Sequence, residues 1–178
     1  EIVNCTVGGR LEVFRRADLG TELAVHRPAL PPSGDEAAES GPRLLMVDST
    51  PVGHCSATGQ LKETFLGGWP ESRFLQIWET GGRSSSLRLI RLGQSIAESQ
   101  AAQPSLDEMV AAVRLFDPEV IYFRPIESEL LFDVVDRVRR EFARPLVVHM
   151  MDDWPERLRL TDPVRFLRLD QALRRLLD

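Results

Sequence analysis

Several features that would assign a protein class at once are missing from this sequence. No stretch approaches the roughly 20 consecutive apolar residues of a membrane-spanning helix, which excludes a helical integral membrane protein. The first residues lack the succession of charged, apolar and small residues that marks a secretory signal. The net charge is -5 and no basic block occurs, so we expect no nucleic-acid partner.

Cysteine and lysine are both rare. Cys5 and Cys55 are the only cysteines and no CxxC pair occurs, so neither a disulfide framework nor a zinc site is expected. Low cysteine usage of this kind favours a reducing compartment, and we predict a cytoplasmic protein. Of the 22 basic residues only Lys62 is a lysine, which we interpret as a compositional trait without functional meaning.

The remaining composition is that of an ordinary globular domain. The chain has 178 residues, of which 43% are hydrophobic and 28% charged, enough for one domain with a real core. It begins with Glu1 instead of a methionine and stops at Asp178, inside an expected helix. We therefore expect it to be a piece of a longer polypeptide.

A proline-rich, acidic segment divides the chain. Residues 28–42 contain four prolines, two glycines, two serines and three acidic residues, and they offer almost nothing apolar to bury. We predict a linker there. It separates a short head, residues 1–27, from a body, residues 43–178.

The body alternates between strand and helix patterns. Continuous apolar runs at 44–47, 120–123 and 146–148 predict strands covered on both faces, and we expect these three in the centre of a sheet. Residues 74–78 and 87–90 have more alternating patterns, typical of strands nearer an edge.

Helix signals fall between these strands. Ser105 and Glu108 form a capping box, Ser128 can cap a second helix, and Asp162-Pro163 can start a third. A shorter helix is expected at 60–66. Alternation of this kind predicts an α/β fold with a doubly wound, Rossmann-like parallel sheet, whose ligands bind beyond the carboxyl ends of the strands.

The loop after the first strand is the first candidate site. Gly53, His54 and Gly59 lie in a stretch of small residues, where backbone amides and a helix N-terminus can approach a phosphate. The loop is neither GxGxxG nor a P-loop, so an NAD or ATP site is disfavoured. Cys55 beside His54 lacks a third orienting group for a thiol nucleophile. The alternative is an ordinary connection whose glycines serve only the turn.

The stretch after the strand at 146–148 is the second candidate site. His149, Asp152 and Asp153 lie where a parallel sheet presents its chemistry, and Trp154 offers an apolar face for a sugar ring. Two other interpretations stay open: a turn-capping aspartate with Trp154 in the core, and a metal site, although this spacing is not specific for a metal. Glu127, after the strand at 120–123, could bind ligand hydroxyls, or be only a solvated acid beside a helix N-terminus.

Three segments together carry a resemblance to a known family. RLLMVDSTPVGHCSATGQLKETFLGGWP, FDPEVIYFRP and RPLVVHMMDDWP resemble the amino-terminal half of a two-domain, GT-B-type glycosyltransferase of the glycogen-synthase-like family. The resemblance covers residues 43–178. The head, residues 2–14, is weakly similar to the tail of flagellin-glycosylation accessory domains; an unrelated extension is the alternative.

The resemblance implies an incomplete GT-B half that holds the acceptor. The loop from Gly53 to Gly59 would lie near the donor diphosphate, and the segment from His149 to Asp153 beside the reacting sugar. A nucleotide-sugar donor would be held by a second domain outside this chain, and the acceptor would be a carbohydrate or a lipid-linked sugar reached by peripheral membrane contact. The family implies no obligatory metal and no further cofactor.

Three functions follow from these observations. The first is the acceptor-side domain of a glycosyltransferase in surface-polysaccharide or glycoconjugate synthesis, inactive by itself. The second is a non-catalytic Rossmann-like module that binds a ligand or a partner. The third is a metal-dependent transferase that uses Asp152 and Asp153.

Overall fold

The computed structural model describes residues 41–81, 85–150 and 153–177. The chain divides into two units, residues 1–40 and 41–178, and the described residues all belong to the second. The predicted head and almost all of the predicted linker lie outside the described residues, as does Asp152.

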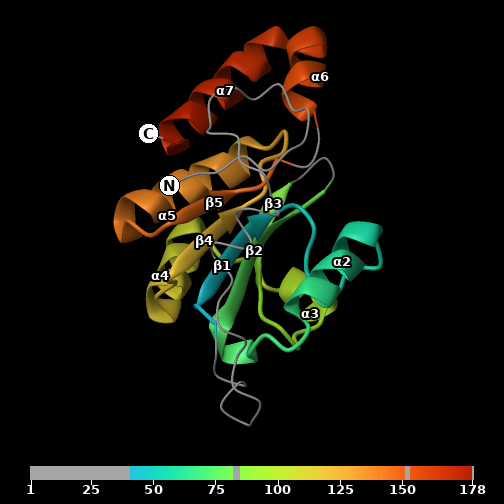
Figure 1. Ribbon diagram of the computed structural model, residues 1–178, viewed down its shortest axis with the longest axis vertical. Helices are drawn as coiled ribbons and strands as arrows, with labels where there is room; N and C mark the ends of the chain where they lie inside the picture. Colours follow the sequence, from blue (N-terminus) through green and yellow to red (C-terminus); the bar gives the residue numbers. More distant parts are fainter. Residues whose placement is uncertain (1–40, 82–84, 151–152, 178) are drawn as a thin grey trace, which may run out of the picture. The chain divides into compact units, whose positions relative to one another are not determined.

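Five strands form one sheet in the order β3-β2-β1-β4-β5 (Figure 1). Their bounds are β1 Leu44–Asp48, β2 Phe74–Thr80, β3 Ser86–Ile90, β4 Val120–Phe123 and β5 Leu146–Val148. Strands β2, β1, β4 and β5 are parallel, while β3 pairs antiparallel with β2. The predicted α/β, Rossmann-like sheet is confirmed.

The expected central position of β5 was wrong. β5 lies at an edge of the sheet, and Val147 leaves 48% of its surface exposed. β3 forms the opposite edge and β2 lies next to it, nearer an edge than β1, as predicted, although the first five residues of β2 are buried. β5 packs on the core through one face only. Leu146 and Val148 contact the larger core, whereas Val147 points the other way. A run of three apolar residues is therefore too short to show that both faces of a strand are covered.

Six helices and one 3-10 turn connect and follow these strands in the described residues. They are α2 Ala57–Leu66, η2 Glu71–Arg73, α3 Ile96–Ala101, α4 Leu106–Phe116, α5 Glu129–Phe142, α6 Trp154–Thr161 and α7 Pro163–Leu177. The predicted capping box at Ser105 is present with both reciprocal hydrogen bonds, and Ser128 accepts from the amide of Leu131. The carboxylate of Asp162 accepts from the amide of Arg165 at the start of α7, as its sequence predicts.

Helices cover both faces of the sheet, with α4 and α5 on one side and α2 and α3 on the other (Figure 1). The larger core joins the first face to α4, α5, α6 and α7 through residues such as Leu45, Val47 and Ile121. The smaller core joins Met46, Phe74 and Trp78 to the α2 side. Apolar side chains alternate between these two cores along β1 and β4, as the pleat of a sheet requires.

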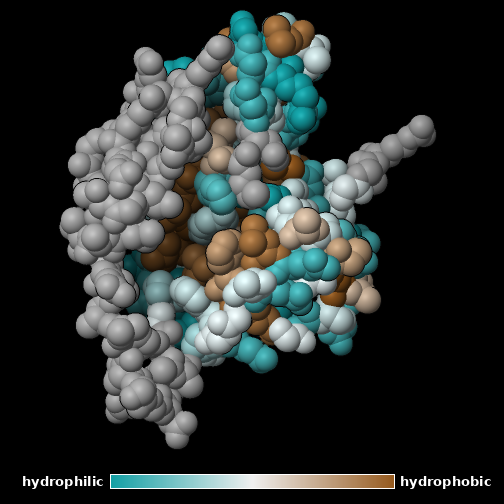
Figure 2. Space-filling view, turned by 45° about the vertical axis from the view of Figure 1, so that its right-hand side comes forward, coloured by the Kyte–Doolittle hydropathy of each residue, from teal (hydrophilic) through white to brown (hydrophobic). Residues whose placement is uncertain are grey.

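The surface of the described residues mixes polar and apolar side chains (Figure 2). The exposed large apolar side chains include Phe65 of α2 and Leu160, Val164 and Leu167 of α6 and α7. None of the described helices is both long and apolar enough to cross a bilayer. A peripheral membrane contact stays a prediction.

Candidate functional site at the carboxyl ends of the strands

The chain order of the sheet creates a switch point between β1 and β4. After β1 the chain adds β2 and β3 on one side, and then returns to add β4 and β5 on the other. Loops leaving β1 and β4 therefore diverge at their carboxyl ends and leave a crevice, where open α/β sheets bind their ligands. Asp48 ends β1, Arg124 follows β4 and His149 follows β5, so all three lie at this edge.

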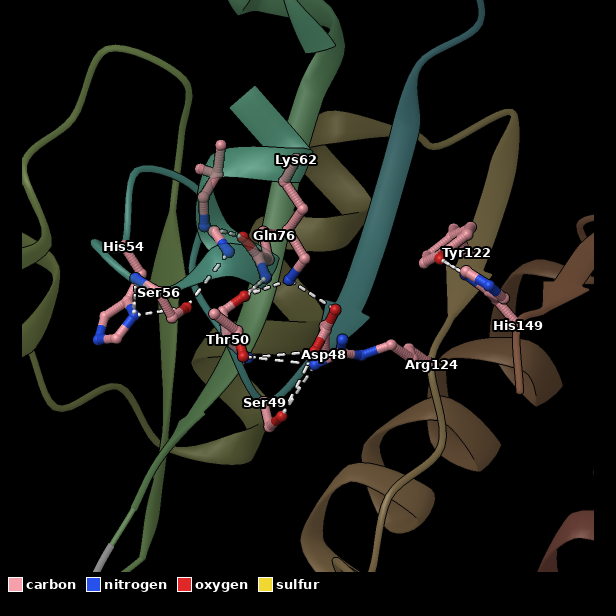
Figure 3. Close-up of polar contacts among 12 residues, drawn as sticks. Asp48, Ser49, Thr50, His54, Ser56, Lys62, Gln76, Tyr122, Arg124 and His149 are labelled. Carbon is pink, nitrogen blue, oxygen red and sulfur yellow. Dashed lines mark hydrogen bonds and ion pairs between the residues drawn. The ribbon is translucent and has the colours of Figure 1, made fainter. Parts of the chain in front are cut away.

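A buried cluster of charges occupies the switch point (Figure 3). Asp48 has no exposed surface, and its carboxylate contacts two cations: Nζ of Lys62 at 2.5 Å and Nη2 of Arg124 at 2.7 Å. Both cations are themselves more than nine-tenths buried. With two cations and one carboxylate, the cluster carries a net charge of +1 when Lys62 is protonated.

This cluster holds the loop that follows β1. Lys62 donates to the carbonyl of Thr50, and Arg124 reaches the hydroxyls of Ser49 and Thr50 at 3.4 and 3.3 Å. The backbone amide of Thr50 donates to Asp48 at 3.1 Å. The direction of the loop is thus set by charged side chains from α2 and from the end of β4.

Gln76 of β2 secures the same loop from the other side. Its side chain is fully buried; Oε1 accepts from the amide of Val52 and Nε2 donates to the carbonyl of Thr50, both at 2.8 Å. One amide side chain therefore satisfies two backbone groups that would otherwise lose hydrogen bonds on burial. Buried polar side chains thus hold the loop from both sides.

Both glycines predicted in this loop have a steric reason to be glycine. Gly53 has a φ of +77°, a region that residues with a Cβ rarely adopt. At Gly59, in the first turn of α2, an added Cβ would lie 2.1 Å from the carbonyl oxygen of His54. The loop can fold back against the start of α2 only because Gly59 has no side chain.

His54 is fixed inside the folded loop. Its Nδ1 accepts from the amide of Ser56 at 3.2 Å and lies 2.9 Å from the Ser56 hydroxyl. Ser56 is also the N-cap of α2 and accepts from the amide of Gly59 at 3.3 Å. Beside this loop lies an open cleft of about 450 Å³, lined by Val52 and Gly53, by α2 and by the turn between β3 and α3.

His149 lies at the other end of the site, next to Tyr122 of β4 (Figure 3). Tyr122 Oη and His149 Nδ1 form a hydrogen bond, and the two rings meet edge to face with centroids 5.8 Å apart. Burial and the Arg124 guanidinium lower the pKa of His149, although the Asp48 carboxylate acts in the opposite direction. His149 is therefore a neutral imidazole at pH 7.

The pKa values of Tyr122 and of Lys62 are also shifted, and Asp48 of the charge cluster contributes to both shifts. Burial is the main cause that raises the pKa of Tyr122 to about 12, and the carboxylate of Asp48 adds to it. Burial lowers the pKa of Lys62 from 10.5 to about 8, even though Asp48 raises it. The desolvation of the ammonium thus outweighs its attraction to the carboxylate.

Three predicted site residues occupy positions outside this constellation. Trp154 is only 2% exposed and packs edge to face on Phe132 in the larger core, and its Nε1 has no hydrogen-bond partner among the described residues. Glu127 forms an ion pair with Arg157 of α6. Asp153 is exposed at the N-cap position of α6, where its carboxylate makes no capping hydrogen bond.

The sequence interpretation missed the centre of the site. Asp48, Arg124 and Tyr122 were not singled out, and Lys62 was set aside as a compositional trait. A signal was available, because the only lysine lies within the short helix predicted at 60–66, next to the glycine loop. Within the described parts of the chain, no three His, Cys, Asp or Glu side chains gather as metal ligands.

Comparisons with family models, with curated proteins and with solved structures find no match to this chain.

Proposed function

We propose that residues 43–178 form the acceptor-side half of a glycosyltransferase that moves a sugar from a nucleotide-sugar to a hydroxyl group. One observation carries the proposal. A single loop at the switch point of the sheet is held by four buried polar side chains: Asp48, Lys62, Gln76 and Arg124. Burying charges costs several kcal/mol per ion in typical proteins, and hydrophobic replacements are often as stable. Such a cluster is therefore better explained by the loop it holds than by stability.

The charge of the cluster favours an anionic ligand. The cluster has a net charge of +1, and its Arg124 contacts the hydroxyls of Ser49 and Thr50. It lies at the same edge of the sheet as the exposed side chain of His149. Hydroxyls, backbone amides and a positive potential are the groups that bind phosphate oxygens. The diphosphate of a nucleotide-sugar offers such oxygens. The same groups would also stabilise the negative charge that develops on the diphosphate as it leaves.

The proposed reaction needs this kind of support. The bond from the anomeric carbon to the diphosphate oxygen breaks, a bond to the acceptor oxygen forms, and the proton of the acceptor hydroxyl passes to the departing diphosphate. Preorganised donors aimed at the developing charge lower the barrier most when they need no rearrangement. The hydroxyls of the loop and His149 would supply such donors from this domain, since the amides of Thr50, Val52 and Ser56 already donate to side chains. The resemblance assigns the nucleotide itself to a second Rossmann-like domain.

An NMR titration of the 178-residue chain tests this proposal. Amide resonances are followed while UDP, GDP or ADP is added, and in parallel samples the matching nucleosides without phosphate. We expect the diphosphates to shift the amides of residues 49–56 with a dissociation constant of about 1 mM or weaker, equivalent to roughly 4 kcal/mol. The nucleosides should cause no shift, because this half would hold only the phosphate and sugar side.

The competing function gives a different result. A non-catalytic Rossmann-like module that binds nucleotides would respond to the nucleosides as well, and a partner-binding module would respond to neither set. Leu115→Ala serves as the matched control, since this side chain is 89% exposed on α4, away from the site. It should bind diphosphates as the unchanged chain does, whereas His149→Ala should bind them more weakly.

A further inference from the structure

The direction of the hydrogen bond between Tyr122 and His149 determines which ring nitrogen of His149 carries the proton. We propose that Tyr122 is a positioning residue that holds His149 as the tautomer protonated on Nε2, so that His149 meets its ligand as a hydrogen-bond donor and not as a general base. The ligand part of this inference rests on the proposed function. The tautomer does not depend on it.

The direction of the hydrogen bond follows from the two groups. Both are neutral at pH 7, so either the phenol donates to Nδ1 or Nδ1–H donates to the phenol oxygen. A phenol is a stronger acid than a neutral imidazole N–H, and an imidazole nitrogen is a stronger base than a phenol oxygen. Tyr122 therefore donates and Nδ1 of His149 accepts.

The remaining ring nitrogen then carries the proton. With Nδ1 accepting, the neutral ring holds its only N–H on Nε2, on the side of the ring away from Tyr122. Among the described residues, Nε2 of His149 has no hydrogen-bond partner, and the side chain is exposed. The charged groups that act on it, Arg124 and Asp48, belong to the buried charge cluster.

This tautomer limits the chemistry of the site. An N–H donor can bind a phosphate oxygen or a sugar hydroxyl, but it cannot take a proton from the acceptor hydroxyl. A base role for His149 would need an unprotonated Nε2 facing the ligand, which would require Nδ1–H and a hydrogen bond in the opposite direction. His149 thus recognises an oxygen acceptor and leaves proton removal to another group.

Nitrogen NMR of the full chain, labelled with ¹⁵N-histidine, reads the tautomer directly. We expect the pattern of an Nε2-protonated neutral ring for His149 at pH 7.5. In Tyr122→Phe the ring packing is kept and only the hydroxyl is lost. The ratio of the two tautomers should then move toward Nδ1–H by roughly two- to tenfold, the effect of one hydrogen bond, and the pKa of His149 should rise because its neutral form has lost a donor.

His54 is the internal control for this experiment. Its Nδ1 accepts from the backbone amide of Ser56, and Tyr122 takes no part in this hydrogen bond, so the tautomer of His54 should stay unchanged. A merely structural role of Tyr122 would lower stability without moving the tautomer ratio of His149. An Nδ1–H ring or an imidazolium in the unchanged chain overturns the proposal, and so does an unaltered ratio in Tyr122→Phe.

Two probes then separate the sources of the oxygen acceptor. A shift of the Nε2–H resonance on adding inorganic pyrophosphate supports a phosphate oxygen, and a shift with D-glucose supports a sugar hydroxyl. If neither probe moves it, His149 is not a ligand donor. Failure of the proposed function is recognised separately, because a partner-binding module could lack any diphosphate binding and still show the Nε2–H tautomer.

Discussion

The only lysine of the chain should make the protein more stable as the pH rises from neutral to alkaline values. Burial lowers the pKa of Lys62 to about 8 in the folded protein, whereas an unfolded chain has the ordinary value of 10.5. Between these two values the unfolded state binds the proton and the folded state does not. The free energy of unfolding therefore increases with pH across this window.

The size of the effect follows from the two pKa values. At about 1.4 kcal/mol for each pH unit, the drop from 10.5 to about 8 corresponds to a penalty of about 3 kcal/mol at pH 7. Integrated from pH 7.5 to pH 10, the gain in stability is about 2 kcal/mol. The raised pKa of Tyr122 acts in the opposite direction, but only above pH 10.

Urea unfolding at intervals between pH 7.5 and pH 10 measures this gain. Lys62→Met keeps the length of the side chain and removes the titrating group, so titrations of cysteines and of the amino terminus cancel in the comparison. We expect the difference in unfolding free energy between the unchanged chain and the variant to grow by about 2 kcal/mol in favour of lysine. Parallel profiles for the two proteins would refute a buried, desolvated Lys62.

Other substitutions test the loop and the site. Gly59→Ala should lose about 1–3 kcal/mol of stability because its Cβ meets a backbone carbonyl, while Gly81→Ala, which has open space, should not; equal urea midpoints would contradict the close approach. Gln76→Leu should lower the free energy of unfolding by about 2–4 kcal/mol, because two buried backbone groups lose their hydrogen-bond partner. Hydrogen exchange at the amide of Val52 should become faster, and an unchanged exchange rate would mean that Gln76 does not hold the loop. In a polypeptide that also contains a donor-binding domain, His149→Ala should lower kcat by about 10²–10³-fold, more than it weakens binding of the nucleotide-sugar; a change in KM alone would mean that His149 acts only in ground-state binding.

Local signals in the sequence predicted most of the elements. The apolar runs of β1, β4 and β5 and the caps at Ser105 and Ser128 depend on neighbouring residues, and each was found where the pattern placed it. Ser95 and Glu98 form a second capping box, at the start of α3, which could have been predicted in the same way. The edge position of β5 could not, because strand order depends on which strands pair.

The candidate site was predicted less completely because its centre is built from distant segments. Asp48, Lys62 and Arg124 come together only when β1 and β4 pair and α2 folds over the sheet. The rule for carboxyl ends of strands placed His149 at the same edge of the sheet as the structure does. It could not show that Tyr122 contacts His149, or that Trp154 turns into the core, since these depend on the direction of individual side chains.

A crystal structure of the 178-residue chain soaked with a nucleotide-sugar tests the proposed site most directly. We predict that the sugar diphosphate lies at the carboxyl ends of β1 and β4, against residues 49–56, with Nε2 of His149 within hydrogen-bond distance of one of its oxygens. Two results would contradict the assignment. One is a nucleotide-sugar bound elsewhere on the chain. The other is an empty site at these strand ends in the crystal although diphosphates saturate the protein in solution.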